Sequence, residues 1–142
     1  MNSEFEIGAG SVDIRVGTDI QSVAEVESAL REHRVSYLDR IFTDHEVDCC
    51  GGRSAATTVL SPGLTRRFAA KEATLKVLRP TALVPRWRDI EVVRHGGGWV
   101  DLVLTGVAEE LADAQQLRTF SLSISHSGGF AVATVIATRL IG

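Results

Sequence analysis

The sequence predicts an α+β fold, a single small domain in which an antiparallel sheet packs against a long central helix and shorter helices. Three observations predict it. Alternating apolar residues mark a strand at 12–16, hairpin signals lie within 89–104 and 120–136, and helix-forming stretches fall between them, the central one at 66–78. This order is typical of the α+β class. We expect a flexible leader over residues 1–10 and the domain itself over 11–142.

Composition and charge narrow the class of protein. The 142 residues suffice for one domain with a core, and 44% hydrophobic with 23% charged residues is ordinary globular composition. The net charge of −3 argues against a broad nucleic-acid-binding face, and no apolar run approaches the about 20 residues needed to cross a membrane. The N-terminus lacks a signal-peptide pattern, and the adjacent Cys49 and Cys50 build no disulfide framework. We therefore expect a cytoplasmic protein without nucleic-acid or membrane partners.

The first strand ends at a candidate site residue. Val12, Ile14 and Val16 alternate with other residues in the period of a half-buried strand. Asp19 follows at or just beyond the end of this strand, where side chains commonly face a cleft. The alternative is that Asp19 is a turn or N-cap residue for the helix predicted over 22–33.

Between this strand and the central helix, the sequence predicts short helices and a loop. The helix at 22–33 is followed by a shorter one at 37–42, and Thr43 to Glu46 has the form of a capping box that starts a third. The segment 51–63 is rich in Gly, Ser, Thr and Pro, which predicts a mobile loop. Such a loop could close over a bound nucleotide, and a plain connector is the alternative.

The central helix at 66–78 carries the densest set of charged candidates. It has no internal Gly or Pro and meets Pro80 just beyond its end. Glu72 is preceded by Lys71 and followed about one turn later by Lys76. A carboxylate between two ammonium groups could hold a divalent metal and a polyphosphate together. The alternative is that Glu72 and Lys76 form an ordinary exposed ion pair.

The last hairpin, which follows a hairpin at 89–104 and a helix at about 107–117, carries two further candidates. Its first strand alternates apolar residues with serines, so Ser125 belongs to the hydroxyl face and His126 continues the apolar face. A hydrogen-bonded structural role is the alternative for His126. Because neighbouring strand residues point to opposite faces and no Gly-x-Ser-x-Gly elbow occurs, this pair does not indicate a hydrolase.

These stretches together resemble a known family. Phe-Ala-Ala-Lys-Glu-Ala-x-x-Lys over 68–76 is similar to the signature of holo-acyl carrier protein synthases, the small bacterial 4′-phosphopantetheinyl transferases. Val-Gly-Thr-Asp-Ile at 16–20 resembles the family's first strand with its metal-binding Asp, and the segment 121–136 resembles its closing hairpin. Arg-Ile-Phe-Thr-x-x-Glu at 40–46 is a weaker match. The motifs occur in family order and together span nearly the whole chain from Val12 onward.

The resemblance implies an enzyme that transfers the 4′-phosphopantetheine arm of coenzyme A to a serine of an apo-acyl carrier protein and releases adenosine 3′,5′-bisphosphate. Asp19 and Glu72 would hold Mg²⁺, and either Glu72 or a metal-bound water would take the serine proton. Lys71 and Lys76 would pair with phosphate oxygens, so that the expected catalytic set is Asp19, Glu72 and Lys76. The candidates for the adenosine 3′-phosphate end are Arg67, Ser125 and His126. The family is commonly a homotrimer with active sites between subunits.

The chain departs from the family's pattern where the carrier protein binds. The family usually has an Arg near the start of the first helix for docking the acidic carrier, and Glu25 stands there in this chain. In this chain the docking of an acidic carrier would fall to another arginine, namely Arg15, Arg31, Arg34 or Arg40. This departure suggests a dedicated carrier from a polyketide or peptide assembly line. The alternative function is a non-catalytic domain of this fold that only binds coenzyme A or a carrier.

Overall fold

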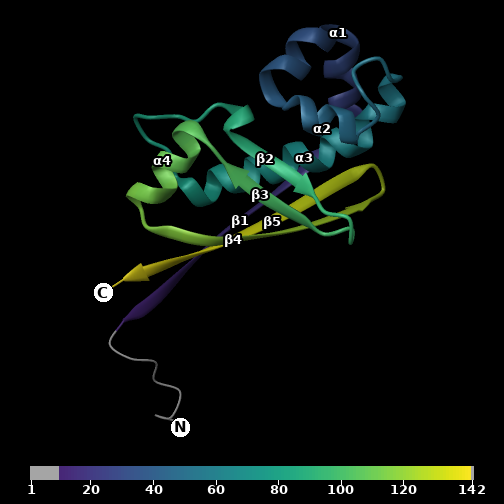
Figure 1. The fold of residues 1–142 in the computed structure, drawn as a ribbon. Helices are drawn as coiled ribbons and strands as arrows, with labels where there is room; N and C mark the ends of the chain where they lie inside the picture. The colour runs from purple at the N-terminus through teal and green to yellow at the C-terminus, as the bar shows by residue number, and fades with distance from the viewer. Residues whose placement is uncertain (1–9, 142) are drawn as a thin grey trace.

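The computed structural model describes residues 10–141, and their helices and strands follow the predicted order (Figure 1). The elements are β1 (Ser11–Ser22), α1 (Val23–Ile41), α2 (Asp44–Cys49), α3 (Thr57–Leu78), the short 3-10 helix η2 (Trp87–Asp89), β2 (Ile90–Arg94), β3 (Val100–Leu104), α4 (Gly106–Ala114), β4 (Leu117–Ser127) and β5 (Phe130–Ile141). The predicted α+β class is confirmed. The expected leader at 1–10 lies outside the described residues except for Gly10.

Two antiparallel sheets organise the molecule around α3. One has the strand order β1-β5-β4, and the other is the β2–β3 hairpin. The helix α3 lies across the three-stranded sheet, while α1 and α2 gather at one end of it (Figure 1). Alanines of α3 and β5 meet in the main core, which is why helix and sheet approach each other closely.

The central helix α3 begins at Thr57, so the prediction of a loop over 51–63 is wrong for residues 57–63. The sequence signal came from Pro62 and Gly63, which disfavour the interior of a helix. Leu60 and Leu64 are fully buried in a second core beside α1 and α2. Burial of each leucine contributes about 1.5–3 kcal/mol, enough to offset the about 3 kcal/mol cost of a proline inside a helix.

The two helices predicted at 22–33 and 37–42 correspond to two helical segments of α1 that meet at a kink. The backbone of α1 departs from helical geometry at His33, with φ −140° and ψ 42°, which divides the helix near the expected gap between 33 and 37. The capping box predicted at the start of α2 is confirmed, because the Thr43 side chain accepts from the amide of Glu46 and Glu46 reciprocates. This cap fixes where the chain turns from α1 into α2.

The strand β1 was predicted correctly, but the face that it buries is the opposite of the one its apolar residues suggest. Arg15 and Gly17 are buried toward α3, whereas Val12, Ile14 and Val16 remain 60–63% exposed. A Cβ atom at Gly17 would lie 2.2 Å from the carbonyl oxygen of Ala73. Contact between the backbones of α3 and β1 therefore requires glycine at position 17, and this requirement decides which face is buried.

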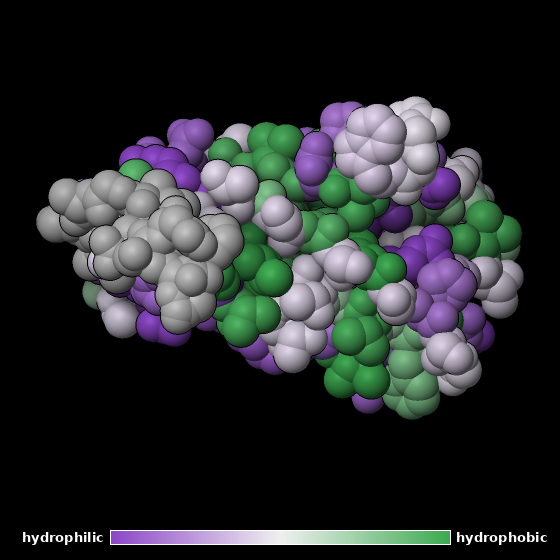
Figure 2. All heavy atoms as spheres, turned by 90° about the horizontal axis from the view of Figure 1, so that it is seen from below, coloured by the Kyte–Doolittle hydropathy of each residue, from purple (hydrophilic) through white to green (hydrophobic). Residues whose placement is uncertain are grey.

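The outward face of the sheet is apolar over two strands. Exposed side chains of β1 and β5 pair across the ladder, as Val12 with Leu140, Val16 with Ile136, and Ile20 with Val132. Seen from below, apolar side chains gather over the middle of this face (Figure 2). A contiguous apolar surface of this kind marks a contact with another molecule.

The remaining elements agree with the sequence. The hairpins occur where they were expected, and Phe120, Leu122 and Ile124 of β4 pack on the core while the intervening serines are exposed. Within residues 10–141, none of the helices is long and apolar enough to cross a membrane.

Candidate active site

The contact between α3 and β1 brings three of the predicted site residues together. Lys76 Nζ lies 3.2 Å from Asp19 Oδ1 and donates to the carbonyl oxygen of Thr18 at 2.7 Å. Gln21 Nε2 donates to the other carboxylate oxygen of Asp19 at 2.7 Å. The N-cap alternative for Asp19 is wrong, because Ser22 is the N-cap of α1 and the Asp19 carboxylate lies against Lys76 of α3.

Glu72 belongs to the same group by its electrostatics. Partial burial raises the pKa of the Glu72 carboxyl, the nearby Asp19 carboxylate raises it further, and Lys76 opposes both effects. The simple i,i+4 ion pair expected as the alternative is not among the ion pairs of the described residues, since Lys76 turns to Asp19 instead. The site therefore consists of two mutually repelling carboxylates with one ammonium group.

This donor set fits a hard divalent cation. Two carboxylates supply the anionic oxygen ligands that Mg²⁺ prefers, and their repulsion favours a cation between them. Among residues 10–141 no cluster of three or more His, Cys, Asp and Glu side chains could hold a metal. Asp19 and Glu72 would consequently share the ion with water and substrate oxygens, as is usual for Mg²⁺ bound beside a phosphate.

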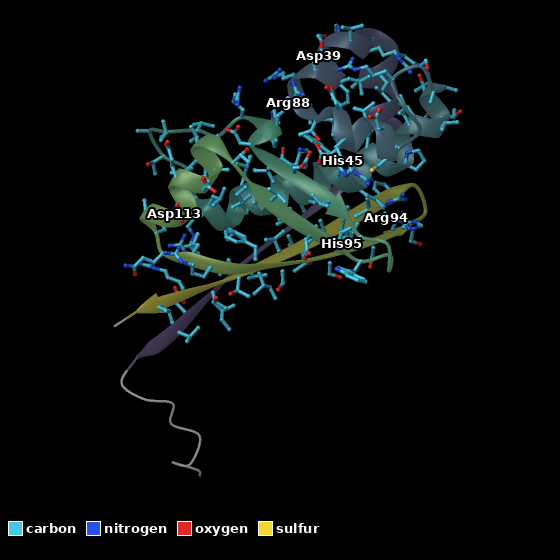
Figure 3. All side chains as sticks on the ribbon, viewed as in Figure 1. Asp39, His45, Arg88, Arg94, His95 and Asp113 are labelled. Atoms are coloured by element: carbon cyan, nitrogen blue, oxygen red, sulfur yellow. The ribbon has the colours of Figure 1, made fainter. Side chains whose placement is uncertain are left out.

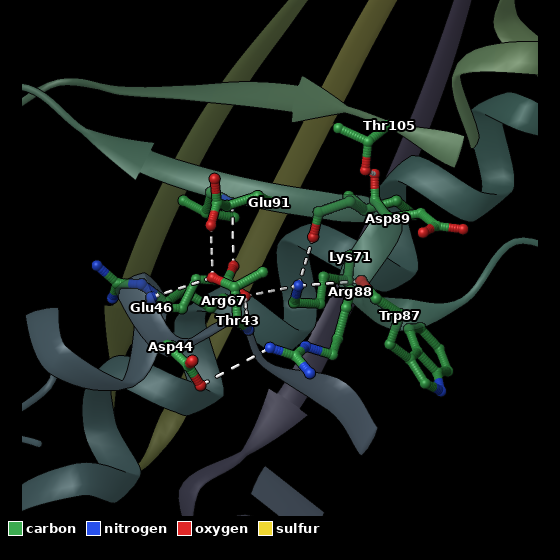
Figure 4. Close-up of polar contacts among 12 residues, drawn as sticks. Thr43, Asp44, Glu46, Arg67, Lys71, Trp87, Arg88, Asp89, Glu91 and Thr105 are labelled. Atoms are coloured by element: carbon green, nitrogen blue, oxygen red, sulfur yellow. Dashed lines mark hydrogen bonds and ion pairs between the residues drawn. The ribbon is translucent and has the colours of Figure 1, made fainter. Parts of the chain in front are cut away.

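Lys71 lies outside this site, in a group of buried polar contacts with Glu46 and Trp87 (Figure 4). Its side chain is fully buried, with Nζ 2.8 Å from Glu46 Oε1 and 3.1 Å from the carbonyl oxygen of Trp87, and it also donates to the carbonyl of Ile90. Burial lowers the pKa of Lys71, while Glu46 acts to raise it. The structure contradicts the expected phosphate contact, because every donor direction of this ammonium group is directed into the interior.

Glu46 shows what Lys71 does instead. One Glu46 carboxylate oxygen accepts from the amide of Thr43 and the other from the amide of Val92, both at 2.9 Å. The buried pair thus joins α3, the start of α2 and the β2 strand. Sequence reasoning identified the cap but missed the ion pair, because no spacing rule connects positions 46 and 71.

A second group of candidates lines a cavity of about 420 Å³ between the β2–β3 hairpin, β4 and α3. Arg67 and His126, two of the candidates for the adenosine 3′-phosphate end, both line it. Sequence reasoning missed three others, namely Arg66, Arg94 and Trp99. Figure 3 shows Arg94 beside His95 on the hairpin. The Arg-Arg doublet at the start of the family motif was the one available signal for Arg66.

The cavity is suited to an anion. Three arginines and no acidic residue line it. Arg67 is 7% exposed, its Nη1 donates to the carbonyl of Gly63 at 3.2 Å, and its buried Nε has no partner among the described residues. A buried guanidinium nitrogen without a hydrogen-bond acceptor destabilises the fold unless a ligand supplies that acceptor. A phosphate oxygen is a suitable acceptor for it.

Ser125 does not join this cavity. Its neighbours Ile124 and His126 line it, and by strand alternation the Ser125 side chain is on the outward face, opposite Val132 of β5. The structure does not bring Ser125 into this cavity with Arg67 and His126, and its predicted role at the 3′-phosphate is otherwise untested. The two groups are also separate within one chain, because neither Asp19 nor Glu72 lines the cavity that contains Arg67.

Comparisons with known proteins identify the family to which the chain belongs. The family model of the 4′-phosphopantetheinyl transferase superfamily matches residues 15–135, and the chain belongs to that superfamily. Its relatives within the superfamily are of the holo-acyl-carrier-protein synthase type. The synthase of Geobacter metallireducens is 39% identical over 129 residues, covering 87% of this chain and 96% of the relative. That of Rhodopirellula baltica is 33% identical over 123 residues, covering 87% and 95%.

A solved structure extends the likeness to three dimensions. The Helicobacter pylori holo-acyl-carrier-protein synthase in complex with coenzyme A superposes with a TM-score of 0.70 at 26% identity. The superposition covers 87% of this chain and 99% of the other. The resemblance read from the motifs is thereby confirmed, both for the fold and for the class of enzyme.

Proposed function

We propose that the protein transfers the 4′-phosphopantetheine arm of coenzyme A to a serine hydroxyl of an apo-acyl carrier protein. The observation that carries the proposal is the convergence of Asp19, Glu72 and Lys76, in a chain related to holo-acyl-carrier-protein synthases. The serine oxygen forms a bond to the phosphorus that bears the pantetheine arm. The bond from this phosphorus to the bridging oxygen breaks, and adenosine 3′,5′-bisphosphate leaves.

Each residue has a distinct part in this displacement. Glu72 is the base that accepts the serine proton, and its raised pKa brings it closer to the range that suits proton transfer. Lys76 neutralises negative charge on the transferred phosphate. Asp19 and Glu72 together would hold Mg²⁺, which when bound supplies electrostatic stabilisation of the pyrophosphate. Gln21 and Lys76 orient the Asp19 carboxylate for this purpose.

The arginine-rich cavity is the proposed site for the adenosine bisphosphate end of coenzyme A. Arg67 and His126 would bind the 3′-phosphate together with Arg66 and Arg94, which line the same cavity. The relative from Helicobacter pylori was solved in complex with coenzyme A, which supports this ligand class for the fold.

We further propose that the enzyme is a homotrimer whose subunits share each active site. Two observations support this. The outward apolar face of β1 and β5 lacks a partner within residues 10–141, and the Asp19–Glu72 group lies apart from the cavity with Arg67. In the trimer, the apolar face of each subunit would be covered by a neighbouring subunit. Coenzyme A held in the cavity of one subunit would then present its phosphates to the carboxylates of the neighbour.

The proposed substrate is a carrier of a polyketide or peptide assembly line. Its support is the first turn of α1, where Glu25 replaces the arginine usual in the family. Comparison of rates with several apo-carriers tests this point, and a housekeeping fatty-acid carrier that proves the best substrate would contradict it.

The decisive experiment measures the intact mass of an apo-carrier after incubation with the protein, coenzyme A and Mg²⁺. A gain of one phosphopantetheine arm is expected, and Glu72→Gln should abolish it. Mixing inactive Glu72→Gln with Arg67→Ala tests the shared site, because a mixed trimer contains some sites with both residues intact. Binding of coenzyme A without any transfer would instead indicate a binding domain.

A further inference from the structure

Buried guanidinium nitrogens without a hydrogen-bond partner occur at three positions within residues 10–141, namely the Nε atoms of Arg15, Arg67 and Arg139. Arg67 lines the arginine-rich cavity described above. Arg15 and Arg139 do not line that cavity, and they lie near the end of the three-stranded sheet where β1 begins and β5 ends. The feature that suits Arg67 to a phosphate is therefore repeated at a second place in the fold.

The register of the strands places these two arginines on the same face of the sheet. Arg139 of β5 is opposite Asp13 of β1, so Arg15, two residues further along β1, is its diagonal neighbour. Diagonal neighbours on one face of an antiparallel pair have their Cα atoms about 7–8 Å apart. The C-terminal end of α3 lies at the same end of the sheet, and its C-cap residue Arg79 adds a third guanidinium group (Figure 1).

The hydrogen bonds at this end of the molecule account for only one of the three arginines. Arg15 is buried, and its Nη1 donates to the carbonyl oxygen of Val77 at 3.1 Å and to the side-chain oxygen of Gln115. These bonds satisfy the end of α3 but leave Nε of Arg15 without an acceptor. The half-buried side chain of Arg139 and the exposed side chain of Arg79 form no hydrogen bond or ion pair with any residue within 10–141.

The charges of this cluster are not balanced by the protein. Burial lowers the pKa of the Arg15 guanidinium, and the nearby Arg79 and Arg139 lower it further, while Asp13 acts in the opposite direction. Asp13 forms no ion pair in the part of the chain that the structure describes, although it is opposite Arg139 in the ladder. Like charges around a buried guanidinium destabilise one another, and an anion among them would offset this repulsion.

We propose that Arg15, Arg79 and Arg139 form a second anion site, which binds a phosphate-type oxyanion at the end of the three-stranded sheet. The oxyanion supplies acceptors to the guanidinium nitrogens that have none. Inorganic phosphate and the phosphate group of a small monoester share this chemistry. The bound anion links β1, β5 and the end of α3, and so stabilises the fold. None of the three arginines lines the cavity proposed for coenzyme A, so the site does not depend on the transferase function.

The test compares thermal unfolding in phosphate-free buffer with unfolding in about 20 mM inorganic phosphate or glycerol 3-phosphate, at equal ionic strength and one fixed protein concentration. The variants are Arg139→Gln and, at an exposed position where folding is least affected, Arg79→Gln. Arg15 is left intact because it holds the end of α3. Arg31→Gln is the matched control, an exposed arginine of α1 outside the cluster. Arg67→Ala separates phosphate binding in the coenzyme A cavity from binding at the second site.

Phosphate at about 20 mM should raise the melting temperatures of the wild type, Arg67→Ala and Arg31→Gln by about 3–6 °C, as expected for a Kd of about 1–5 mM. Arg139→Gln and Arg79→Gln should lose about half of this rise or more. In phosphate-free buffer Arg139→Gln should be at least as stable as the wild type, because its repulsion of Arg15 is removed.

An equal rise in the wild type, Arg139→Gln and Arg79→Gln would overturn the second site, and so would an equal loss of the rise in Arg31→Gln. A rise that disappears in Arg67→Ala but remains in Arg139→Gln would assign the phosphate to the coenzyme A cavity and also overturn the proposal. If the site exists, a larger rise with glycerol 3-phosphate than with inorganic phosphate identifies a monoester as its ligand, and equal rises identify the free ion.

Discussion

Replacement of Lys71 by methionine separates a structural lysine from a catalytic one. Lys71→Met retains the apolar stem but leaves the buried Glu46 carboxylate without its cation, and two main-chain carbonyls without a donor. Removal of one partner from a buried ion pair costs about 3–5 kcal/mol. For a chain of this size, that loss lowers the melting temperature by about 6–20 °C. It is a large part of the about 5–15 kcal/mol that holds a domain folded.

The assay is urea unfolding followed by circular dichroism, at one fixed protein concentration because subunit association also stabilises the fold. Glu46→Gln and the double variant complete a double-mutant cycle, in which the double variant should be less unstable than the sum of the two single changes. Lys76→Met is the matched control, since its side chain is 53% exposed. It should change stability by less than about 1 kcal/mol and abolish transfer.

Two results would refute this reasoning. One is a loss of less than about 1 kcal/mol in Lys71→Met, which would mean that the buried pair does not hold α2, α3 and β2 together. The other is a folded, equally stable Lys71→Met variant with a strongly raised KM for coenzyme A. That outcome would mean that Lys71 binds a phosphate of coenzyme A in spite of its burial.

Three further predictions concern the site and the contact beneath it. Glu72→Gln should raise the melting temperature at pH 7, because folding raises the pKa of the Glu72 carboxyl and the wild-type protein therefore loses stability as the pH rises through that pKa. The gain should vanish below about pH 4, where the carboxyl of Glu72 and the amide of the variant are both neutral. A lower melting temperature of the variant at pH 7 would contradict the burial of Glu72 and its repulsion from Asp19. Gly17→Ala should destabilise the fold by about 1–3 kcal/mol or more in urea unfolding, since its Cβ atom would lie 2.2 Å from Ala73 O; a neutral effect would show that β1 and α3 can separate at no cost. Arg67→Ala should raise the KM for coenzyme A about tenfold or more in initial-rate assays, whereas Ser125→Ala, on the opposite face of β4, should leave it unchanged; equal effects would place both side chains in one site.

Local pattern was sufficient for the elements and for part of the site. The period-2 alternation of β4, the glycines between β2 and β3, and the Thr43–Glu46 capping box all act over a few residues. The motif residues Asp19, Glu72 and Lys76 were identified because their types and order match a family, and the structure brings them together. Patterns that depend on neighbouring residues can be recognised from the sequence without knowledge of the fold.

Long-range packing decided the rest. The start of α3 at Thr57 depends on the burial of Leu60 and Leu64 against other helices. Intrinsic helix propensities contain no contribution from such tertiary packing. The inward face of β1 is set by the approach of Ala73 to Gly17, so the apolar residues whose alternation predicted the buried face lie outside the core.

The same cause separates the two lysines of the central motif. Lys71 and Lys76 have equal charge and lie on one helix, yet one meets Glu46 in the interior and the other meets Asp19 at the surface. The sequence by itself determined the class of enzyme, the order of its elements and the carboxylate pair. Only the tertiary structure decided which charged side chains face solvent, because their partners come from elements far away along the chain.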